Sequence, residues 1–256
     1  MWAMAVPRQG IAHGNARLGI AMCSKHLGTV DDAGLNRAGA DQRVTRRLLA
    51  CGALAGPSFV TMFMAEGARR PGYDPVRHPV SSLALGPGGW QQTANFLVAG
   101  TLYVAGAVGM ARDRRTSAGS VVSPVLVGAA GAGLIGSGAF TTDPVSGYPP
   151  GTSDAPGRPT RSGIIHDLSA LPTFLGLPVA QLVFARSFRR AGFRGWAAYS
   201  AASAGLMGVN FVLASAAFGQ APHLVRYGGV FQRLSVSAGF TWLTAIFLRA
   251  QRAMTH

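Results

Sequence analysis

The chain has 256 residues, of which 48% are hydrophobic and 12% are charged, with a mean hydropathy of +0.26. Soluble domains carry about 25% charged residues, so this composition excludes an ordinary soluble globular domain and favours a membrane protein. The net charge is +14, but Lys and Arg occur in short runs between apolar stretches, which is typical of membrane topology rather than of a nucleic-acid-binding surface.

The first 45 residues show no hydrophobic periodicity. Their apolar start, Met1–Val6, is too short for the core of a signal peptide. We expect residues 1–45 to form a disordered basic cytoplasmic tail, or to result from a start codon assigned too far upstream.

Six stretches with at most one charge follow, and each is long enough to cross a bilayer as a helix. They lie at 48–65, 93–111, 120–140, 168–185, within 195–222, and at 227–248. In the third, Gly128, Ala132 and Gly136 recur every four residues, a spacing that lets another helix approach closely. The predicted fold is all-α: a polytopic membrane protein with six transmembrane helices in one bundle (residues 46–250) and a short cytoplasmic tail at 251–256.

The distribution of Lys and Arg predicts the orientation. An even number of spans places both termini on one side, which carries 16 Lys and Arg against 7 on the other. Because the side richer in Lys and Arg faces the cytoplasm, we expect both termini to be cytoplasmic in the plasma membrane. The connections 66–92, 141–167 and 219–228 then face outward.

The polar residues of this outward side are the candidate site. Arg233 lies six residues after Tyr227 and so about 9 Å deep in the sixth helix at 1.5 Å per residue. A charge at that depth normally faces a partner in the bundle interior. The available anions are Glu66, Asp143 and Asp167, and we expect Asp143 to be the partner.

Small and polar side chains also form stripes on three helices, each set sharing one helix face. The sets are His166, Ser169, Thr173 and Gly176; Arg233, Ser237, Thr241 and Thr244; and Ser203 with Asn210. Such stripes are either packing faces with hydrogen bonds between helices or the lining of a polar cavity that opens outward.

The catalytic candidates are His166, Asp143 and Asp167. The fourth transmembrane helix is expected to begin at His166 and Asp167, at the outward side of the membrane. In that place His166 would act as an acid or base that a nearby carboxylate orients. No further histidine stands three or four residues from His166, and none of the HExxH, GxSxG, P-loop or Rossmann patterns occurs. We therefore predict no metal and no cofactor.

Four segments carry a resemblance to a known family. They are Pro71–Leu83 (PGYDPVRHPVSSL), Gly138–Pro144 (GAFTTDP), Ile165–Ala170 (IHDLSA) and Gly228–Val236 (GGVFQRLSV). They resemble the Gly-Tyr…Pro-x-Ser-x-Leu loop, the Gly-x-Phe-x-x-Asp-Pro turn, the histidine at the start of the fourth helix and the Gln/Glu-Arg pair of the sixth in the "domain of unknown function 998" family of bacterial and archaeal integral membrane proteins. The likeness covers about residues 46–249.

The resemblance implies a fold and a topology but no activity. Its motifs add Tyr73 and Gln232 to the candidate cluster of Glu66, Asp143, His166, Asp167 and Arg233. The chain departs from the family at Ser81-Ser82-Leu83, where the resemblance implies Ser-Glu-Leu, so an acidic side chain is missing from that loop.

Three functions are compatible with these features. The leading hypothesis is a non-enzymatic membrane protein whose outward polar pocket binds or passes a lipid or small amphiphile. The second is an integral-membrane enzyme acting on a lipid or isoprenoid substrate with His166 as acid or base. The third is a structural or assembly subunit. Membrane lipids are the expected partners, nucleic acid is not expected, and the sequence does not indicate the oligomeric state.

Overall fold

The computed structural model describes residues 17–113 and 121–254, with side chains from residue 35 onward. The chain divides into two units, Met1–Arg43 and Val44–His256, which we describe separately. Among the described residues there is no β-strand.

In the first unit the backbone is helical from Arg17, the start of helix α1 (Arg17–Arg69). The sequence showed no periodicity before residue 46, whereas the structure has helical backbone over residues 17–45; residues 1–16 lie outside the described residues, and the assignment of residues 1–45 as a cytoplasmic tail stays a prediction. The expectation of disorder relied on apolar periodicity, which indicates a helix whose one face packs against other elements. A helix without such a face is not detected in this way. Residues 17–45 contain no proline, and residues other than proline and glycine differ little in helix propensity.

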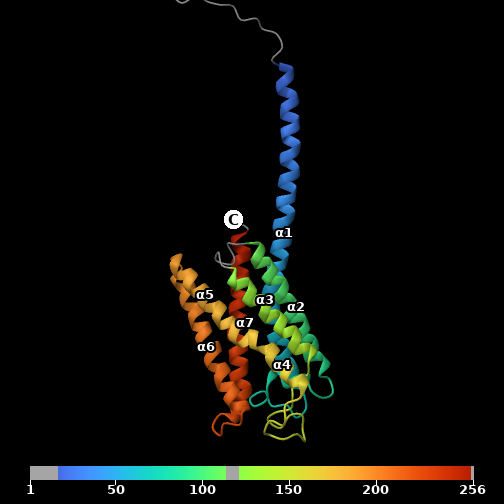
Figure 1. The fold of residues 1–256 in the computed structure, drawn as a ribbon, viewed down its shortest axis with the longest axis vertical. Coiled ribbons are helices and arrows are strands. Elements are labelled where there is room, and N and C mark those ends of the chain that lie inside the picture. The colour runs from blue at the N-terminus through green and yellow to red at the C-terminus, as the bar shows by residue number, and fades with distance from the viewer. Residues whose placement is uncertain (1–16, 114–120, 255–256) are drawn as a thin grey trace, which may run out of the picture. The chain divides into compact units, whose positions relative to one another are not determined.

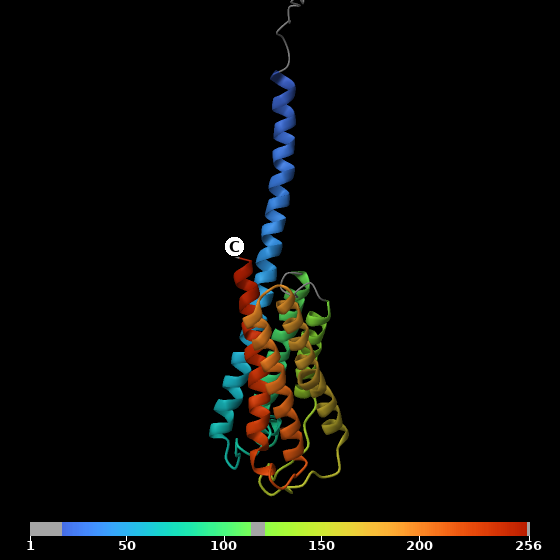
Figure 2. The ribbon, with the colours of Figure 1, turned by 90° about the vertical axis from the view of Figure 1, so that its left-hand side faces the viewer.

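The second unit is a helical bundle (Figures 1 and 2). After residues 44–69 of α1, its long helices are α2 (Trp90–Arg112), α3 (Val122–Ala139), α4 (Arg161–Leu171), α5 (Leu177–Arg190), α6 (Arg194–Phe218) and α7 (Gly228–Ala253). Short helical turns are η1 (Val80–Ala84), the π-helical turn η2 (Pro172–Gly176), which joins α4 to α5, and η3 (Val225–Tyr227).

Five helical segments of the described chain are long and apolar enough to cross a membrane: Leu35–Arg69, Trp90–Arg112, Val122–Ala139, Arg161–Arg190 and Arg194–Phe218. The prediction of an all-helical chain is thus confirmed for the described residues, and five of the six predicted spans correspond to helices that are long and apolar enough to cross a membrane. The sixth predicted span corresponds to α7, which is 26 residues long and contains Arg233, Arg249 and Arg252.

Aromatic side chains of α7 form much of the bundle core. The ring centroid of Phe240 lies 5.4 Å from that of Phe59 on α1 and 5.1 Å from that of Tyr103 on α2. On the other side, Trp242 lies 5.3 Å from Phe184 on α5. α7 therefore packs between α1 and α2 on one side and α5 on the other, although it contains three arginines.

Glycines set the closest helix crossings. A Cβ atom on Gly131 of α3 would lie 2.8 Å from the Gly100 carbonyl oxygen on α2. On the next face of α3, a Cβ on Gly133 would collide with the Ser169 carbonyl of α4, and one on Gly136 would lie 2.5 Å from the Ser169 hydroxyl. Of the predicted Gly128, Ala132 and Gly136 repeat, Gly136 makes a close approach, whereas a Cβ on Gly128 would be an ordinary 3.5 Å from Ala107.

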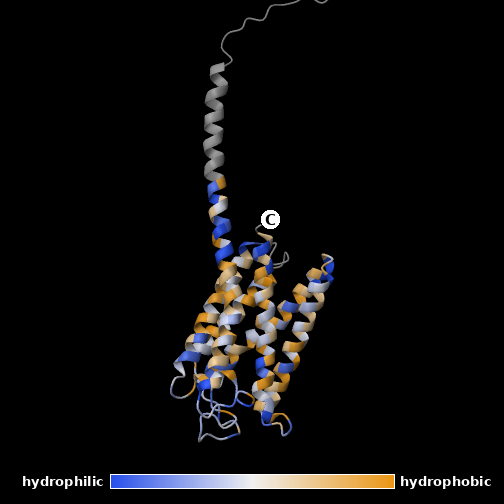
Figure 3. Ribbon diagram, turned by 180° about the vertical axis from the view of Figure 1, so that it is seen from behind, coloured by the Kyte–Doolittle hydropathy of each residue, from blue (hydrophilic) through white to orange (hydrophobic). Residues whose placement is uncertain are grey.

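The three connections 70–89, 140–160 and 219–227 gather at one end of the bundle, opposite the C-terminal end of α7 (Figures 1 and 2). Figure 3 shows mostly apolar or neutral helix between this loop end and the opposite end, where polar residues appear again. The common location of the three connections agrees with the sequence prediction that they lie on one side.

Candidate functional site

Arg233, near the start of α7, holds the first connection in place. Its Nη1 atom donates to the carbonyl oxygens of Pro75 (2.6 Å), His78 (3.1 Å) and Gly229 (3.1 Å), and Nη2 donates to the Tyr73 hydroxyl (2.6 Å). The side-chain oxygen of the neighbouring Gln232 accepts a hydrogen bond from the Val80 amide at 2.7 Å. These contacts fix the loop 73–80 on α7.

The expected pairing of Arg233 with Asp143 is wrong. Within the described residues the ion pairs are Arg70–Glu66 and Arg77–Asp154, and neither involves Arg233. The carbonyl dipoles of the first loop take the place of a counter-ion. Sequence could not reveal this, because a carbonyl acceptor leaves no residue signature.

Asp143 instead caps α4. Its carboxylate accepts hydrogen bonds from the Thr160 amide (2.8 Å) and the Thr160 hydroxyl (2.7 Å), while the same hydroxyl accepts from the Gly163 amide (3.0 Å). Threonine is a favoured residue before a first helical turn. The helix consequently begins at Arg161, so the prediction that it opens at His166 and Asp167 is wrong by more than one turn.

Glu66 also has a local role. Its carboxylate pairs at 2.8 Å with Arg70, which directly follows the last residue of α1. Arg70 in turn donates to the carbonyl oxygens of Pro87 (2.7 Å) and Gly88 (2.9 Å), which closes the end of the first connection.

Three rings join the first and second connections. The ring centroids of Tyr73, His78 and Tyr148 lie 5.2–5.4 Å apart. The Asp74 amide donates to His78 Nδ1 at 2.8 Å, so Nε2 carries the proton and donates to the Ser146 carbonyl at 3.1 Å. Burial lowers the pKa of His78, with Asp74 acting in the opposite direction, and burial raises the pKa of Tyr73, partly offset by Arg233.

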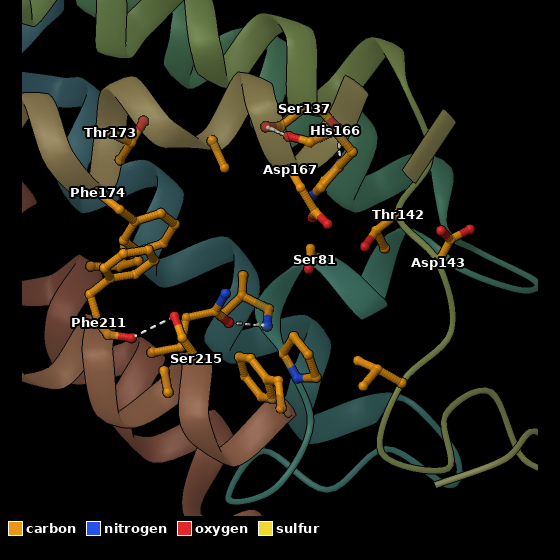
Figure 4. A pocket seen from close by; sticks show the side chains of 18 of the residues that line it. Ser81, Ser137, Thr142, Asp143, His166, Asp167, Thr173, Phe174, Phe211 and Ser215 are labelled. Atoms are coloured by element: carbon orange, nitrogen blue, oxygen red, sulfur yellow. Dashed lines mark hydrogen bonds between the residues drawn. The ribbon is translucent and has the colours of Figure 1, made fainter. Parts of the chain in front are cut away.

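A pocket of about 450 Å³ lies below these loops, between α4 with η2 on one side and α6 with α7 on the other. Its inner wall includes the rings of Phe59, Phe96, Phe174, Phe211, Phe218 and Phe240. Figure 4 shows Thr142, Asp143, Asp167 and Ser81 toward the connections, and Phe174 and Phe211 at the other end of the pocket. The two carboxylates thus lie toward the connections, whereas Thr173 and Ser215 accompany the two phenylalanines at the other end.

His166 lines this pocket and has a fixed orientation. Its Nδ1 atom lies 2.9 Å from the Ser137 carbonyl and 3.0 Å from the Phe140 carbonyl. Because both partners are acceptors, Nδ1 carries the proton, and Nε2 presents a lone pair. Among the described residues Nε2 has no hydrogen-bond partner, although the residue is only 4% exposed.

Asp167 follows His166 on α4 and also lines the pocket. Its carboxylate makes no hydrogen bond or ion pair with any residue that the structure describes, in contrast to Asp143 and Glu66. The pocket therefore holds one uncommitted carboxylate beside one uncommitted imidazole nitrogen.

The predicted cluster is divided between two places. Asp143, His166, Asp167 and Gln232 line the pocket, whereas Glu66, Tyr73 and Arg233 lie in the contacts that hold the first connection. Sequence reasoning missed the phenylalanine wall, because a phenylalanine that faces a pocket and one that faces lipid look alike in an apolar helix. It also did not include His78 and Tyr148 in the cluster. The available signal was that each follows a residue of the cluster by five positions, His78 after Tyr73 and Tyr148 after Asp143.

The polar stripes act mainly as packing faces. Ser203 donates to the Ala238 carbonyl at 3.0 Å, and Thr244 donates to the Ala53 carbonyl at 3.4 Å, both between helices. Asn210 bonds to its own helix at Leu206 (2.8 Å). Thr173 and His166 face the pocket, so one of the three stripes contributes to a cavity. The described residues contain no group of three or more His, Cys, Asp or Glu side chains placed to hold a metal ion.

Comparison with known proteins identifies one family. The family model described as "Protein of unknown function (DUF998)" matches residues 53–249, which is most of the chain and nearly all of the bundle. No curated protein and no solved structure matches the chain. The chain therefore belongs to the DUF998 family.

Proposed function

We propose that the protein is a multi-pass protein of the plasma membrane that binds or passes a small amphiphile in the pocket between α4 and α6. The observation that carries this proposal is the division of the pocket into a phenylalanine-lined end and an end with two carboxylates at the connections. Its volume of about 450 Å³ falls in the range of about 300–1,000 Å³ that is usual for small-molecule sites.

The membrane arrangement behind the proposal has six spans, with α7 as the sixth. The two terminal nitrogens of its Arg233 guanidinium have carbonyl and hydroxyl partners, which supports a place at the membrane boundary rather than outside it. The excess of Lys and Arg on the side of the termini supports cytoplasmic termini and outward connections. The pocket then opens toward the outer face.

Binding of alkyl probes tests this function. The protein in phosphatidylcholine nanodiscs is titrated with dodecylamine, dodecanol and dodecyl phosphate, with the signal of empty nanodiscs subtracted. We expect saturable binding of at least one probe, and its loss in Ala170→Phe, because residue 170 lines the pocket and a phenyl ring would fill it. The matched control is Ala202→Phe on the exposed face of α6, which should bind normally. Absence of saturable binding, or equal binding by both variants, contradicts the proposal.

A membrane enzyme with His166 as general base is the second candidate, and the tautomer of His166 favours it. The carbonyls of Ser137 and Phe140 hold the Nδ1 proton and leave Nε2 as a base that faces the pocket. The expected orientation of His166 by Asp143 or Asp167 is not found; backbone carbonyls provide it. Turnover of a lipid or isoprenoid substrate that survives in His166→Gln would remove this candidate.

A further inference from the structure

Three hydroxyls of the pocket present acceptors rather than donors, whereas the hydroxyls of Ser81 and Thr142 keep their protons for a ligand. The pocket-lining hydroxyls of Ser137, Thr173 and Ser215 donate to the backbone carbonyls of His166 (3.3 Å), Ala130 (3.3 Å) and Phe211 (2.9 Å), respectively. A hydroxyl that has given its one proton to a carbonyl keeps only lone pairs for a ligand.

The Nε2 atom of His166 is likewise a hydrogen-bond acceptor. With its proton held by two backbone carbonyls, the imidazole offers Nε2 to the pocket as an acceptor. Nε2 has no partner in the described chain, and a ligand that displaced water from it without supplying a donor would leave it unpaired, which is costly. The atom therefore points to a ligand group that donates a hydrogen bond.

The charges of the pocket are negative. Asp143 and Asp167 line it, and among the described residues no Lys or Arg does. Asp143 is engaged by Thr160, whereas Asp167 has no protein partner in the described chain. The opposing polar group is the amide of Gln232, whose oxygen is taken by Val80 and whose nitrogen is a neutral donor.

From this donor and acceptor pattern we propose that the ligand of the pocket is an amphiphile with a cationic, hydrogen-bond-donating head, such as a primary ammonium. The ammonium binds the Asp167 carboxylate and His166 Nε2, and the alkyl chain lies along Phe174 and Phe211. An ammonium has three donors and no acceptor, which matches the Asp167 carboxylate and the lone pair of His166 Nε2. The inference rests on the proposed function, since it names the class of amphiphile that the same pocket takes.

Anionic lipids fit the site poorly. A phosphate head brings negative charge toward two carboxylates, and like charges brought into contact are unfavourable. It also offers acceptors to Nε2, to the three committed hydroxyls and to Asp167, which are acceptors themselves. This leaves the hydroxyls of Ser81 and Thr142 and the amide nitrogen of Gln232 as its neutral donors. A neutral alcohol can donate one bond but gains nothing from the charge of Asp167.

The probes described above separate this inference from the proposed function. At neutral pH we expect dodecylamine to bind about tenfold or more tightly than dodecanol, because a hydrogen bond between charged groups is stronger than one between neutral groups, and dodecyl phosphate to bind weakest. Asp167→Asn keeps the shape of the side chain and removes its charge. It should weaken binding of dodecylamine about tenfold and leave dodecanol binding unchanged.

The control is Asp154→Asn, a carboxylate in the second connection whose side chain is 66% exposed and pairs with Arg77 outside the pocket. It changes the net charge equally and should leave all three affinities unchanged. If dodecanol or dodecyl phosphate binds as tightly as dodecylamine, or if Asp167→Asn does not weaken amine binding, the cationic head is wrong while the amphiphile pocket stands. If no probe binds saturably, both proposals fail.

Discussion

The guanidinium of Arg233 donates to three backbone carbonyls and one tyrosine hydroxyl, and Asp143 accepts from Thr160, the residue that caps the start of α4. The two side chains thus stabilise different segments. We expect Arg233→Ala to lower the free energy of unfolding by about 2–3 kcal/mol, because it leaves acceptors unsatisfied. Asp143→Ala should cost about 1–2 kcal/mol through the weakened start of α4.

The double variant Asp143→Ala/Arg233→Ala should show the sum of the two losses to within about 0.5 kcal/mol. Unfolding in mixed micelles, followed by circular dichroism, measures all three variants against the original protein. A coupling free energy above about 1 kcal/mol would instead reveal an ion pair between the two residues.

His78 makes the loop end sensitive to acid. Burial lowers its pKa in the folded protein, so at mildly acidic pH the unfolded chain binds the proton more tightly than the folded one. The contribution of neutral His78 is complete above the unfolded pKa of about 6.5 and is lost as the pH falls below it. We expect the melting temperature to fall between about pH 7.5 and pH 5, and to fall less in His78→Gln.

The control for this prediction is His223→Gln, which replaces an exposed histidine in the third connection. Its pH profile should match that of the original protein. Identical profiles for His78→Gln and the original protein would mean that the buried imidazole does not determine the acid sensitivity.

At the scale of elements, the crossing of α3 and α4 positions His166 and Asp167 relative to the rest of the pocket. It depends on Gly133, where a Cβ would collide with the Ser169 carbonyl. Gly133→Ala should therefore destabilise the bundle by about 1–3 kcal/mol through forced separation of the helices. Gly205→Ala is the matched control on α6, since nothing lies within 4 Å of its Cβ position.

Because alanine favours a helix over glycine by up to about 1 kcal/mol, Gly205→Ala should leave the melting temperature unchanged or raise it. Thermal unfolding of the two variants side by side measures the difference. Equal stability of Gly133→Ala and Gly205→Ala would show that α3 and α4 do not cross as closely as described.

At the scale of the whole molecule, the proposed six spans predict which glycines reach the outside. Gly157 in the second connection and Gly195 at the opposite end of the bundle both have open space at their Cβ positions. With Cys23 and Cys51 replaced by serine, Gly157→Cys should react with a membrane-impermeant maleimide in intact cells. Gly195→Cys should react only after permeabilisation.

Ala253→Cys, at the end of α7, extends this test to the sixth span. It should behave like Gly195→Cys if α7 crosses the membrane. Labelling of Ala253→Cys in intact cells, with Gly195→Cys protected, would mean that α7 does not cross.

Hydropathy predicted most of this architecture, because membrane helices must be long, apolar and nearly free of charge. The first five spans appeared as such runs, and the three connections were correctly placed at one end. Hydropathy missed the early start of α4 at Arg161, because the Asp143–Thr160 cap that begins the helix joins residues 17 positions apart.

The candidate site was predicted only in part. Residue type identified Asp143, His166 and Asp167 as unusual in an apolar chain, and all three line the pocket. Their partners were not predictable, since Arg233 and His166 bind backbone carbonyls, and every residue has a carbonyl. Which aromatic rings face inward depends on helix rotation, which a sequence without a clear polar face does not specify.

The most direct test of the account is to locate a bound amphiphile. A dodecylamine analogue with a photoreactive diazirine near the end of its chain is bound to the protein in nanodiscs, activated by light and located by peptide mass spectrometry. The account predicts crosslinks at Phe174 and Phe211 that unlabelled dodecylamine prevents and that disappear in Ala170→Phe. Crosslinks confined to outward side chains such as Leu168 and Val209, and unchanged in Ala170→Phe, would contradict it.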